Sequence, residues 1–333
     1  MKQIRITSSI ICAILAANTR SAPPEAASSA YPSGTHRQLV RKFYTAADGL
    51  PADDIRAVAV ARNGLVLVSC SNSLGRLDGE RWRQETGPAG VSALFAPLRG
   101  PEALAGASNG VWSLSQDRWQ KEEGSPAGAI AFAAEPDGTP WVLAPSGVWR
   151  RTDRWTRVHD TADDEMDGAR SLLPLGPDDV LIASRTGLFG LMGKRKYWLS
   201  LEVRPGGLLS RDTRAVTRQD RDHFLVATDK GLNVSDGTRG WHAFSGADGL
   251  PIVDLTSAVV AEDGTAWFGS DDGLVRWQTG RWTYLASHRW LPHNRVTAIA
   301  PGRDGSVWVG TPKGLAHLYY RPDRKSTRLN SSH

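Results

Sequence analysis

The sequence has little cysteine and no long apolar run. Its 333 residues include two cysteines, Cys12 and Cys70. Cys12 lies in an N-terminal segment that we expect to be removed, which leaves one thiol and no internal disulfide. Cys70 has no histidine near it in the sequence, and this favours an incidental thiol over a nucleophile.

The chain also lacks a charge excess in its central part. The formal net charge is +5, but the first 22 residues carry +3 and the last eleven carry +2. The residues between them are therefore close to neutral. A protein that follows a phosphate backbone needs a basic stripe, so we expect no nucleic-acid partner.

The N-terminus has the pattern of an export signal. Lys2 and Arg5 precede an apolar stretch at 10–17 that is far too short to span a bilayer. We predict a signal peptide at 1–22, although the small-x-small pattern Ser28-Ser29-Ala30 allows cleavage up to residue 30, and a Pro/Ala/Ser-rich linker over 23–36. The chain is then exported, to the periplasm or another extracytoplasmic compartment. A disordered start with a chance apolar run is the alternative.

What the chain has in quantity is short apolar runs separated by turn signals. Between residues 248 and 282, turn residues recur every 8 to 10 positions, with β-branched or aromatic residues between them. This spacing predicts several short strands joined by hairpins and no helix. The D-G pairs supply the positive φ angles that tight turns need.

The same unit recurs along the chain with a period of about 40 residues. A closing tryptophan occurs at Trp82, Trp119, Trp155, Trp198, Trp241 and Trp282. A turn glycine precedes it, at Gly110, Gly147, Gly187, Gly231, Gly273 and Gly314, and Ser73 takes this place in the first copy. Four-stranded units repeated at this period predict a β-propeller, all-β, with seven antiparallel blades over 37–322. We expect the repeated tryptophans to pack between blades.

The two ends of the repeat region complement each other. Residues 38–44 resemble the fourth strand of a blade, whereas the seventh copy supplies three strands at 296–320 and has no closing tryptophan. We therefore predict that residues 38–44 pair with residues 315–320 as the outermost strand of the last blade. Such a clasp closes the ring.

The last eleven residues, 323–333, do not resemble the repeats. Their sequence, D-R-K-S-T-R-L-N-S-S-H, resembles the translation of a sequencing-library adapter, so we interpret them as a non-native tail. A natural basic tail is the alternative. If the adapter interpretation holds, the natural reading frame continues beyond this point.

Three motifs resemble the two-component regulator propeller repeat. They are D-G-L-P at 48–51 and 248–251, D-G-x-x-W at 263–267 and 304–308, and G-T-x-x-G-L at 310–315. Copies one, six and seven match well, and copies two to five are degenerate. The resemblance implies the extracytoplasmic sensing part of a bacterial membrane receptor, whose output is a histidine kinase or a diguanylate cyclase.

An enzyme is harder to support from these residues. None of the eight histidines has metal-ligand spacing with a carboxylate partner, and His288 and His293 are the nearest approach to a cluster. The acidic loop 160–167 lacks the D-x-D-x-D-G calcium pattern. Streptogramin-type lyases also use seven blades, but the His/Glu constellation that they need with magnesium is missing. We predict no catalytic residue, no metal and no cofactor.

A ligand is expected on one face of the propeller. The loop into each inner strand and the turn between the second and third strands emerge on the same side of a blade, around an axial funnel. The charged or amide residues at these positions are Arg56, Asn72, Asn109, Arg185, Arg214, Lys230, Asp271, Asp272, Arg295 and Lys313.

Two functions follow from this sequence, and the fold alone does not choose between them. The first is a ligand-sensing propeller of a truncated signalling receptor. Its ligand would be a small molecule or oligosaccharide, its partner a second copy in a receptor dimer, and its membrane link a missing C-terminal segment. The second is a secreted, stand-alone binding or scaffold propeller. A streptogramin-lyase-like enzyme is a more distant third.

Overall fold

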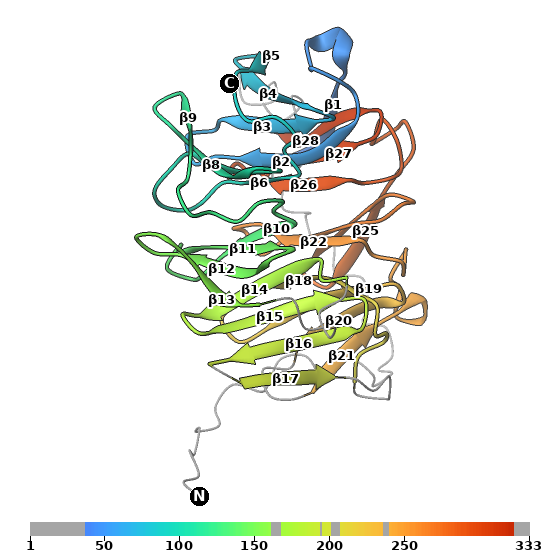
Figure 1. Cartoon of the computed structure of the whole chain (residues 1–333). Coiled ribbons are helices and arrows are strands. Elements are labelled where there is room, and N and C mark those ends of the chain that lie inside the picture. The colour runs from blue at the N-terminus through green and yellow to red at the C-terminus, as the bar shows by residue number, and fades with distance from the viewer. Residues whose placement is uncertain (1–36, 161–167, 194, 201–206, 236–239, 323–333) are drawn as a thin grey trace, which may run out of the picture. The chain divides into compact units, whose positions relative to one another are not determined.

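Seven antiparallel sheets of four strands each make up the described part of the protein (Figure 1). The computed structural model describes residues 37–160, 168–193, 195–200, 207–235 and 240–322. The predicted signal peptide, linker and C-terminal tail lie outside these residues, as does the acidic loop from residue 161 to 167. Two short 3-10 helices, η1 (Ala46–Asp48) and η3 (Gly246–Asp248), form at the two D-G-L-P motifs.

Each of the first four sheets, blades 1 to 4, consists of four consecutive strands. Blade 1 contains β2 (Ile55–Val60), β3 (Val66–Cys70), β4 (Ser73–Asp78) and β5 (Arg81–Glu85). Blade 2 contains β6 (Ala93–Phe95), β7 (Ala103–Ala107), β8 (Gly110–Ser115) and β9 (Arg118–Lys121). Blade 3 contains β10 (Ala131–Ala134), β11 (Pro140–Ala144), β12 (Gly147–Arg151) and β13 (Trp155–His159). Blade 4 contains β14 (Ser171–Gly176), β15 (Asp179–Ser184), β16 (Gly187–Met192) and β17 (Arg195–Ser200).

Blades 5 and 6 repeat this arrangement, and blade 7 departs from it. Blade 5 contains β18 (Thr213–Arg218), β19 (Phe224–Thr228), β20 (Gly231–Ser235) and β21 (Trp241–Phe244). Blade 6 contains β22 (Ser257–Val260), β23 (Ala266–Gly269), β24 (Leu274–Gln278) and β25 (Arg281–Leu285). Blade 7 contains β26 (Ala298–Pro301), β27 (Val307–Thr311), β28 (Gly314–Pro322) and, from the start of the described chain, β1 (Arg37–Tyr44).

The blades follow one another around a ring. The first strand of each blade contacts the first strand of the next, from β2 through β6, β10, β14, β18 and β22 to β26, and β26 in turn contacts β2. The fold is therefore the predicted seven-bladed β-propeller. The second strands are largely buried, and all five residues of β3, β7, β11 and β27 are buried, so the core lies between the sheets.

The ring closes as the repeat count predicts. β1 pairs antiparallel with β28 along its whole length, from Tyr44 opposite Leu315 to Arg37 opposite Pro322. In Figure 1 the blue β1 accordingly lies beside the red β28. Tyr44 is buried and packs on Trp308 of the same blade and Trp82 of blade 1, with ring centroids 5.7 Å apart in both pairs. The closing strand therefore joins the last blade to the first.

A hydroxyl and a glycine explain the G-T-x-x-G motif. In blade 7, Thr311 Oγ1 donates to the Gly314 carbonyl at 2.8 Å and accepts from the Lys313 backbone N–H at 3.2 Å. The same donation recurs from Ser184, Thr228 and Ser270 to the glycine three residues on. Blades 4 and 5, which are degenerate in sequence, thus keep this turn. Blades 1 to 3 have Cys70, Ala107 and Ala144 in its place.

Repeated tryptophans pack between strands, as expected. Trp82 and Trp155 are each 5% exposed. Trp282 stacks on Trp277 at 5.3 Å and meets Phe244 of blade 5 at 5.7 Å. The side chain of Trp198 lies outside the part of the structure that is described. These contacts place large apolar rings at the joints between blades, where their burial stabilises the ring.

Candidate functional site

The ten residues predicted from the sequence occupy loops and strand starts on one side of the strands. We call this the funnel face; it consists of the loops leading into the first strands and the turns between second and third strands. Arg56 lies in β2, Arg214 lies in β18, and Arg295 precedes β26. The other seven lie in the turns, namely Asn72, Asn109, Arg185, Lys230, Asp271, Asp272 and Lys313. Nine are exposed, and Arg214 is partly buried.

A chain of ion pairs crosses the funnel face from blade 4 to blade 6. Arg170 Nη1 lies 2.7 Å from Asp212 Oδ1. Arg214 approaches the other oxygen of Asp212 at 3.2 Å and Asp254 Oδ1 at 2.7 Å. Asp212 therefore accepts from guanidinium groups with both carboxylate oxygens, an arrangement that favours charged, oriented groups.

Of the four residues in these ion pairs, only Arg214 was predicted from the sequence. Arg170 and Asp212 each stand directly before a first strand, and Asp254 stands three residues before one. That position in the repeat is the signal that identifies them. To identify these residues from the sequence, the first residue of each inner strand must be known. The spacing of the turns does not give it.

Two further ion pairs lie on the funnel face and are not connected to this series. Arg56 Nε is 3.7 Å from Asp54, which also accepts from Ser71 Oγ at 2.6 Å. Arg295 Nε is 3.3 Å from Asp271 Oδ1. Both pairs are largely exposed, so each contributes little to stability.

The remaining predicted residues have different environments. Asn109 Oδ1 accepts from the Trp112 indole at 3.0 Å, and the Asp272 carbonyl accepts from the Tyr284 hydroxyl at 2.7 Å. Within the described residues, no hydrogen bond or ion pair is seen for the side chains of Arg185, Lys230 and Lys313. These three exposed cations stand in equivalent turns of blades 4, 5 and 7.

The funnel face is not uniform around the ring. At the start of the first strands, blades 2 and 3 carry Ser92 and Ile130 instead of ion pairs, and Ile130 is 43% exposed. Ser92 Oγ donates to the Ala129 carbonyl at 2.7 Å. Polar groups thus extend from blade 4 round to blade 1, and blades 2 and 3 present a neutral, partly apolar sector.

Grooves of about 360 and 340 Å³ occur elsewhere in the described part of the chain, and neither is lined by any of the ten residues.

Side chains that suggested chemistry have structural roles. Cys70 is fully buried, and burial raises the pKa of its thiol to about 11, so it stays protonated and unreactive. Asp137 of a D-G turn accepts from the Thr139 backbone at 2.8 Å, which lowers the pKa of its carboxyl. Asp263 and Asp304 accept in the same way. The D-G motifs are therefore turn-forming.

The histidines that the structure describes do not gather at one site. His293 Nδ1 accepts from the Arg295 backbone at 3.0 Å, and no contact between His293 and His288 is seen in the described structure. His223 pairs with Asp220 at 2.8 Å in the β18–β19 turn, at the opposite end of the strands from the funnel face. Among the residues that the structure describes, no group of three His, Cys, Asp or Glu side chains is placed to hold a metal ion. Nor does any described helix have the length and apolarity to cross a membrane.

Comparison with known proteins supports the repeat assignment. Residues 291–313, in the seventh repeat, match the family model described as two component regulator propeller. This stretch contains the D-G-x-x-W turn at 304–308 and bears out the resemblance seen in the motifs. A comparison with curated proteins gave no match.

Solved structures share the fold at low sequence identity. The extracellular domain of a putative hybrid two-component system from B. thetaiotaomicron has a TM-score of 0.67 and 12% identity, covering 86% of this chain and 42% of that chain. The extracellular domain of a putative one-component system from B. thetaiotaomicron has a TM-score of 0.65 and 16% identity, covering 85% and 40%. Virginiamycin B lyase from Staphylococcus aureus has a TM-score of 0.62 and 12% identity, covering 85% and 99%. The present chain spans about two fifths of the length of the first two.

Proposed function

We propose that this chain is the exported sensor propeller of a bacterial signalling receptor whose output region, a kinase or a cyclase, follows the propeller. The observation that carries the proposal is the match of residues 291–313 to the two component regulator propeller family model. The likeness in fold to extracellular domains of B. thetaiotaomicron signalling systems supports it. On this proposal the chain works outside the cytoplasm, and a second copy is its partner in a receptor dimer.

The funnel face is the ligand site of this proposal. Its polar sector, from blade 4 round to blade 1, offers guanidinium, ammonium and carboxylate groups, and its neutral sector offers Ile130. A small oligosaccharide or similar polar molecule fits this combination, because its hydroxyl groups bind charged forks and its ring faces contact apolar side chains. Arg214 is the central group, since it belongs to blade 5 and reaches Asp254 of the next blade.

A ligand on this face would change how adjacent blades are held. Arg170, Asp212, Arg214 and Asp254 link three blades through pairs of 2.7 to 3.2 Å. A ligand that bonds to Arg214 competes with these pairs, and its differential affinity shifts the relative positions of the blades. The signal would then pass to whatever follows Pro322.

A thermal-shift screen of the exported chain against a panel of mono- and oligosaccharides and amino acids tests the ligand site. A ligand that raises Tm should lose its effect in Arg214→Ala and keep it in Arg218→Ala, which alters the other end of the same strand. Titration calorimetry should show a Kd at least tenfold weaker for Arg214→Ala. A ligand whose affinity is unchanged by substitutions at Arg170, Arg214 and Lys230 would disprove the funnel site.

The stand-alone scaffold and the lyase remain as rival functions. The lyase is favoured by the similarity of fold to virginiamycin B lyase alone. No histidine–glutamate contact is seen on the funnel face among the described residues. The lyase function is tested by incubating the chain with magnesium and a streptogramin B antibiotic, followed by mass spectrometry. A cleaved antibiotic would establish the lyase, and an intact antibiotic would oppose it.

A further inference from the structure

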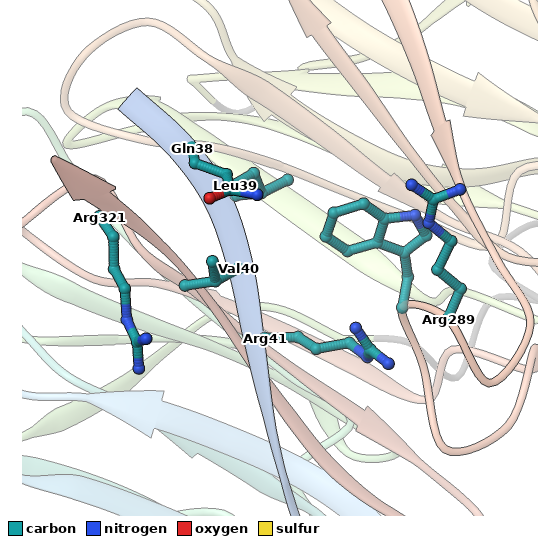
Figure 2. A pocket seen from close by; sticks show the side chains of 7 residues that line it. Gln38, Leu39, Val40, Arg41, Arg289 and Arg321 are labelled. Carbon is teal, nitrogen blue, oxygen red and sulfur yellow. The ribbon is translucent and has the colours of Figure 1, made fainter. Parts of the chain in front are cut away.

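A groove of about 360 Å³ runs beside the closing strand, and none of the ten predicted residues lines it. Its walls include four consecutive residues of β1, Gln38 to Arg41, together with Arg321 at the end of β28 and Arg289 and Trp290 in the loop before β26. In Figure 2, the side chains of Leu39 and Arg41 point to the side of β1 on which Arg289 lies. Arg321 lies on the other side of β1. Because consecutive strand residues point to opposite faces, a groove that touches all four follows the edge of the strand.

The groove contains three arginines and no carboxylate. Arg41, Arg289 and Arg321 are exposed, and within the described residues none is seen in an ion pair. Each is instead held against an aromatic ring, with the guanidinium carbon 5.3 Å from Phe43, 5.8 Å from Trp290 and 5.5 Å from Tyr319, respectively. Arg321 also donates to the Tyr319 hydroxyl at 2.8 Å. Stacking fixes a guanidinium while leaving most of its N–H groups available.

The second groove differs from this arrangement. There, Arg303 is paired with Glu262 at 2.9 Å, and Arg62 donates to the Leu98 carbonyl at 2.6 Å. Two of the three arginines of that groove are therefore engaged by the protein itself. The three arginines beside β1 are instead held by aromatic rings, and within the described residues no carboxylate neutralises their charge.

The backbone of β1 adds a second kind of binding group. β1 is the outermost described strand of its sheet, so the N–H and C=O groups on its outer side have no strand partner among the described residues. It has eight residues, whereas the fourth strands of the other blades have four to six. A long edge is a template for a further strand.

Charge decides which strand this edge accepts. A second copy would bring the same arginines against each other, and like charges across a strand pair are destabilising. An extended peptide with carboxylates at alternate positions would place them on the face of the sheet that carries Arg41 and Arg289, and its other side chains would lie on the opposite face, with Val40. We propose that this groove binds an extended acidic peptide segment, which adds as a fifth strand to the edge of β1 and pairs its carboxylates with Arg41 and Arg289.

Fluorescence polarisation of the full chain with labelled heptapeptides tests this proposal. The probe alternates glutamate and valine, one control alternates glutamine and valine, and a second alternates glutamate and proline. The proline peptide keeps the charge but lacks the N–H group at every second residue, and proline disfavours pairing within a sheet. We expect the glutamate–valine peptide to bind at least about tenfold more tightly than either control, with affinity falling as salt is raised.

Substitutions in the protein locate the site. Arg41→Glu and Arg289→Glu should each weaken binding of the glutamate–valine peptide about tenfold or more. Arg281→Glu, on the fourth strand of blade 6, is the matched control and should leave it unchanged. All three residues are exposed, and unchanged circular dichroism and Tm would verify that each variant is folded.

Several results would overturn the proposal. Equal binding of the proline peptide would mean anion binding without strand addition. Binding of heparin fragments but not of the peptide would assign the groove to a polysaccharide. An equal loss in Arg281→Glu would mean a general charge effect. A dimer of the free chain, seen by light scattering and abolished by Arg41→Glu, would make a second copy the occupant. The funnel-face ligand assay is independent of all four results.

Discussion

At the scale of single residues, the repeated turn glycine is fixed by the strand beside it. Gly231 has φ of 137°, and a Cβ there would lie 2.3 Å from the Phe244 carbonyl oxygen of the fourth strand. At Gly314 the carbonyl 2.6 Å away belongs to Tyr44 of β1. The closing strand therefore takes the place that a fourth strand takes in the other blades, and it imposes the same requirement for glycine.

Gly231→Ala should destabilise the protein by about 3 kcal/mol, because the new methyl group meets backbone that cannot move without opening the blade. Gly264→Ala is the control, since Gly264 also has positive φ (79°) but has open space around it. Its cost should be about 1 kcal/mol, the steric cost of the backbone conformation alone. Urea unfolding of the two variants measures the difference. Equal losses would show that the carbonyl contact does not matter.

A second residue-scale feature is the partly buried His317 of β28. Its ring stacks on Trp308 with centroids 3.9 Å apart, and its buried Nε2 atom has no hydrogen-bond partner within the described structure. Burial lowers the pKa of His317 to about 4; the nearby Asp304 opposes this shift, and Lys42 adds to it. His317 is therefore neutral in the folded protein at neutral pH.

Acid should weaken the closing blade through His317. An unfolded histidine binds a proton below about pH 6.5, while the folded one does so only near pH 4, so stability is lost as the pH falls between these values. Between pH 7.5 and pH 4.5, the free energy of unfolding should therefore fall by about 2 kcal/mol less in His317→Phe than in the original protein. Urea unfolding at both pH values measures it. His223→Gln, on an exposed turn, is the control; if it flattens the pH dependence as much as His317→Phe does, the assignment to His317 is wrong.

At the scale of elements, β1 is the strand on which ring closure depends. It packs Leu39 and Phe43 against the core between blades 6 and 7, and Tyr44 against Trp82 and Trp308. It has no covalent connection to the strand it pairs with, other than through the whole ring. The energy of closure therefore comes from these side chains and from the backbone pairing with β28.

Deleting residues 31–46 should lower Tm by about 15 °C. The deletion removes the packing of Leu39, Phe43 and Tyr44 against the core, whose burial contributes about 6 kcal/mol. Deleting residues 323–333 should leave Tm unchanged, because the outer strand of blade 7 is already supplied by β1. Thermal unfolding followed by circular dichroism compares the two variants. A harmless N-terminal deletion together with a destabilising C-terminal deletion would refute closure by β1.

At the scale of the whole molecule, the ring has no intrinsic first blade. Arg37 and Pro322 are opposite each other in the β1–β28 register, so a two-residue turn suffices to join them. Chain ends at the exposed turn between β4 and β5, at Gly79 and Glu80, would then move the clasp from blade 7 to blade 1. The contacts within and between blades would all remain.

Such a circular permutant should fold to the same propeller with Tm within about 5 °C of the original chain, because exposed turn positions tolerate new ends. Placing the new ends between Leu67 and Val68, in the buried strand β3, should prevent folding and serves as the control. Circular dichroism and calorimetry distinguish these outcomes. If the turn permutant does not fold, closure at blade 7 has a role beyond completing a sheet.

The sequence by itself determined the blade number, the strand order within each blade and the closure. Hairpins are local, so a turn glycine and a tryptophan at a spacing of 36 to 43 residues specify one blade each. Counting three strands at one end and one at the other then left a single way to complete the ring. The degenerate copies were harder to judge, because Ser184 and Thr228 form the same turn contact as Thr311 in a different local sequence.

Only the tertiary structure decided which charged side chains meet. Arg170 and Asp212 are 42 residues apart and pair because consecutive blades place equivalent positions side by side. Arg41, Arg289 and Arg321 come from both ends of the repeat region and line one groove only after the ring has closed. Repeat spacing specifies where a residue stands within its blade, but the direction of a side chain across a joint depends on how two blades pack. A periodic sequence encodes the first of these locally, and the second arises from contacts between segments that are distant in the chain.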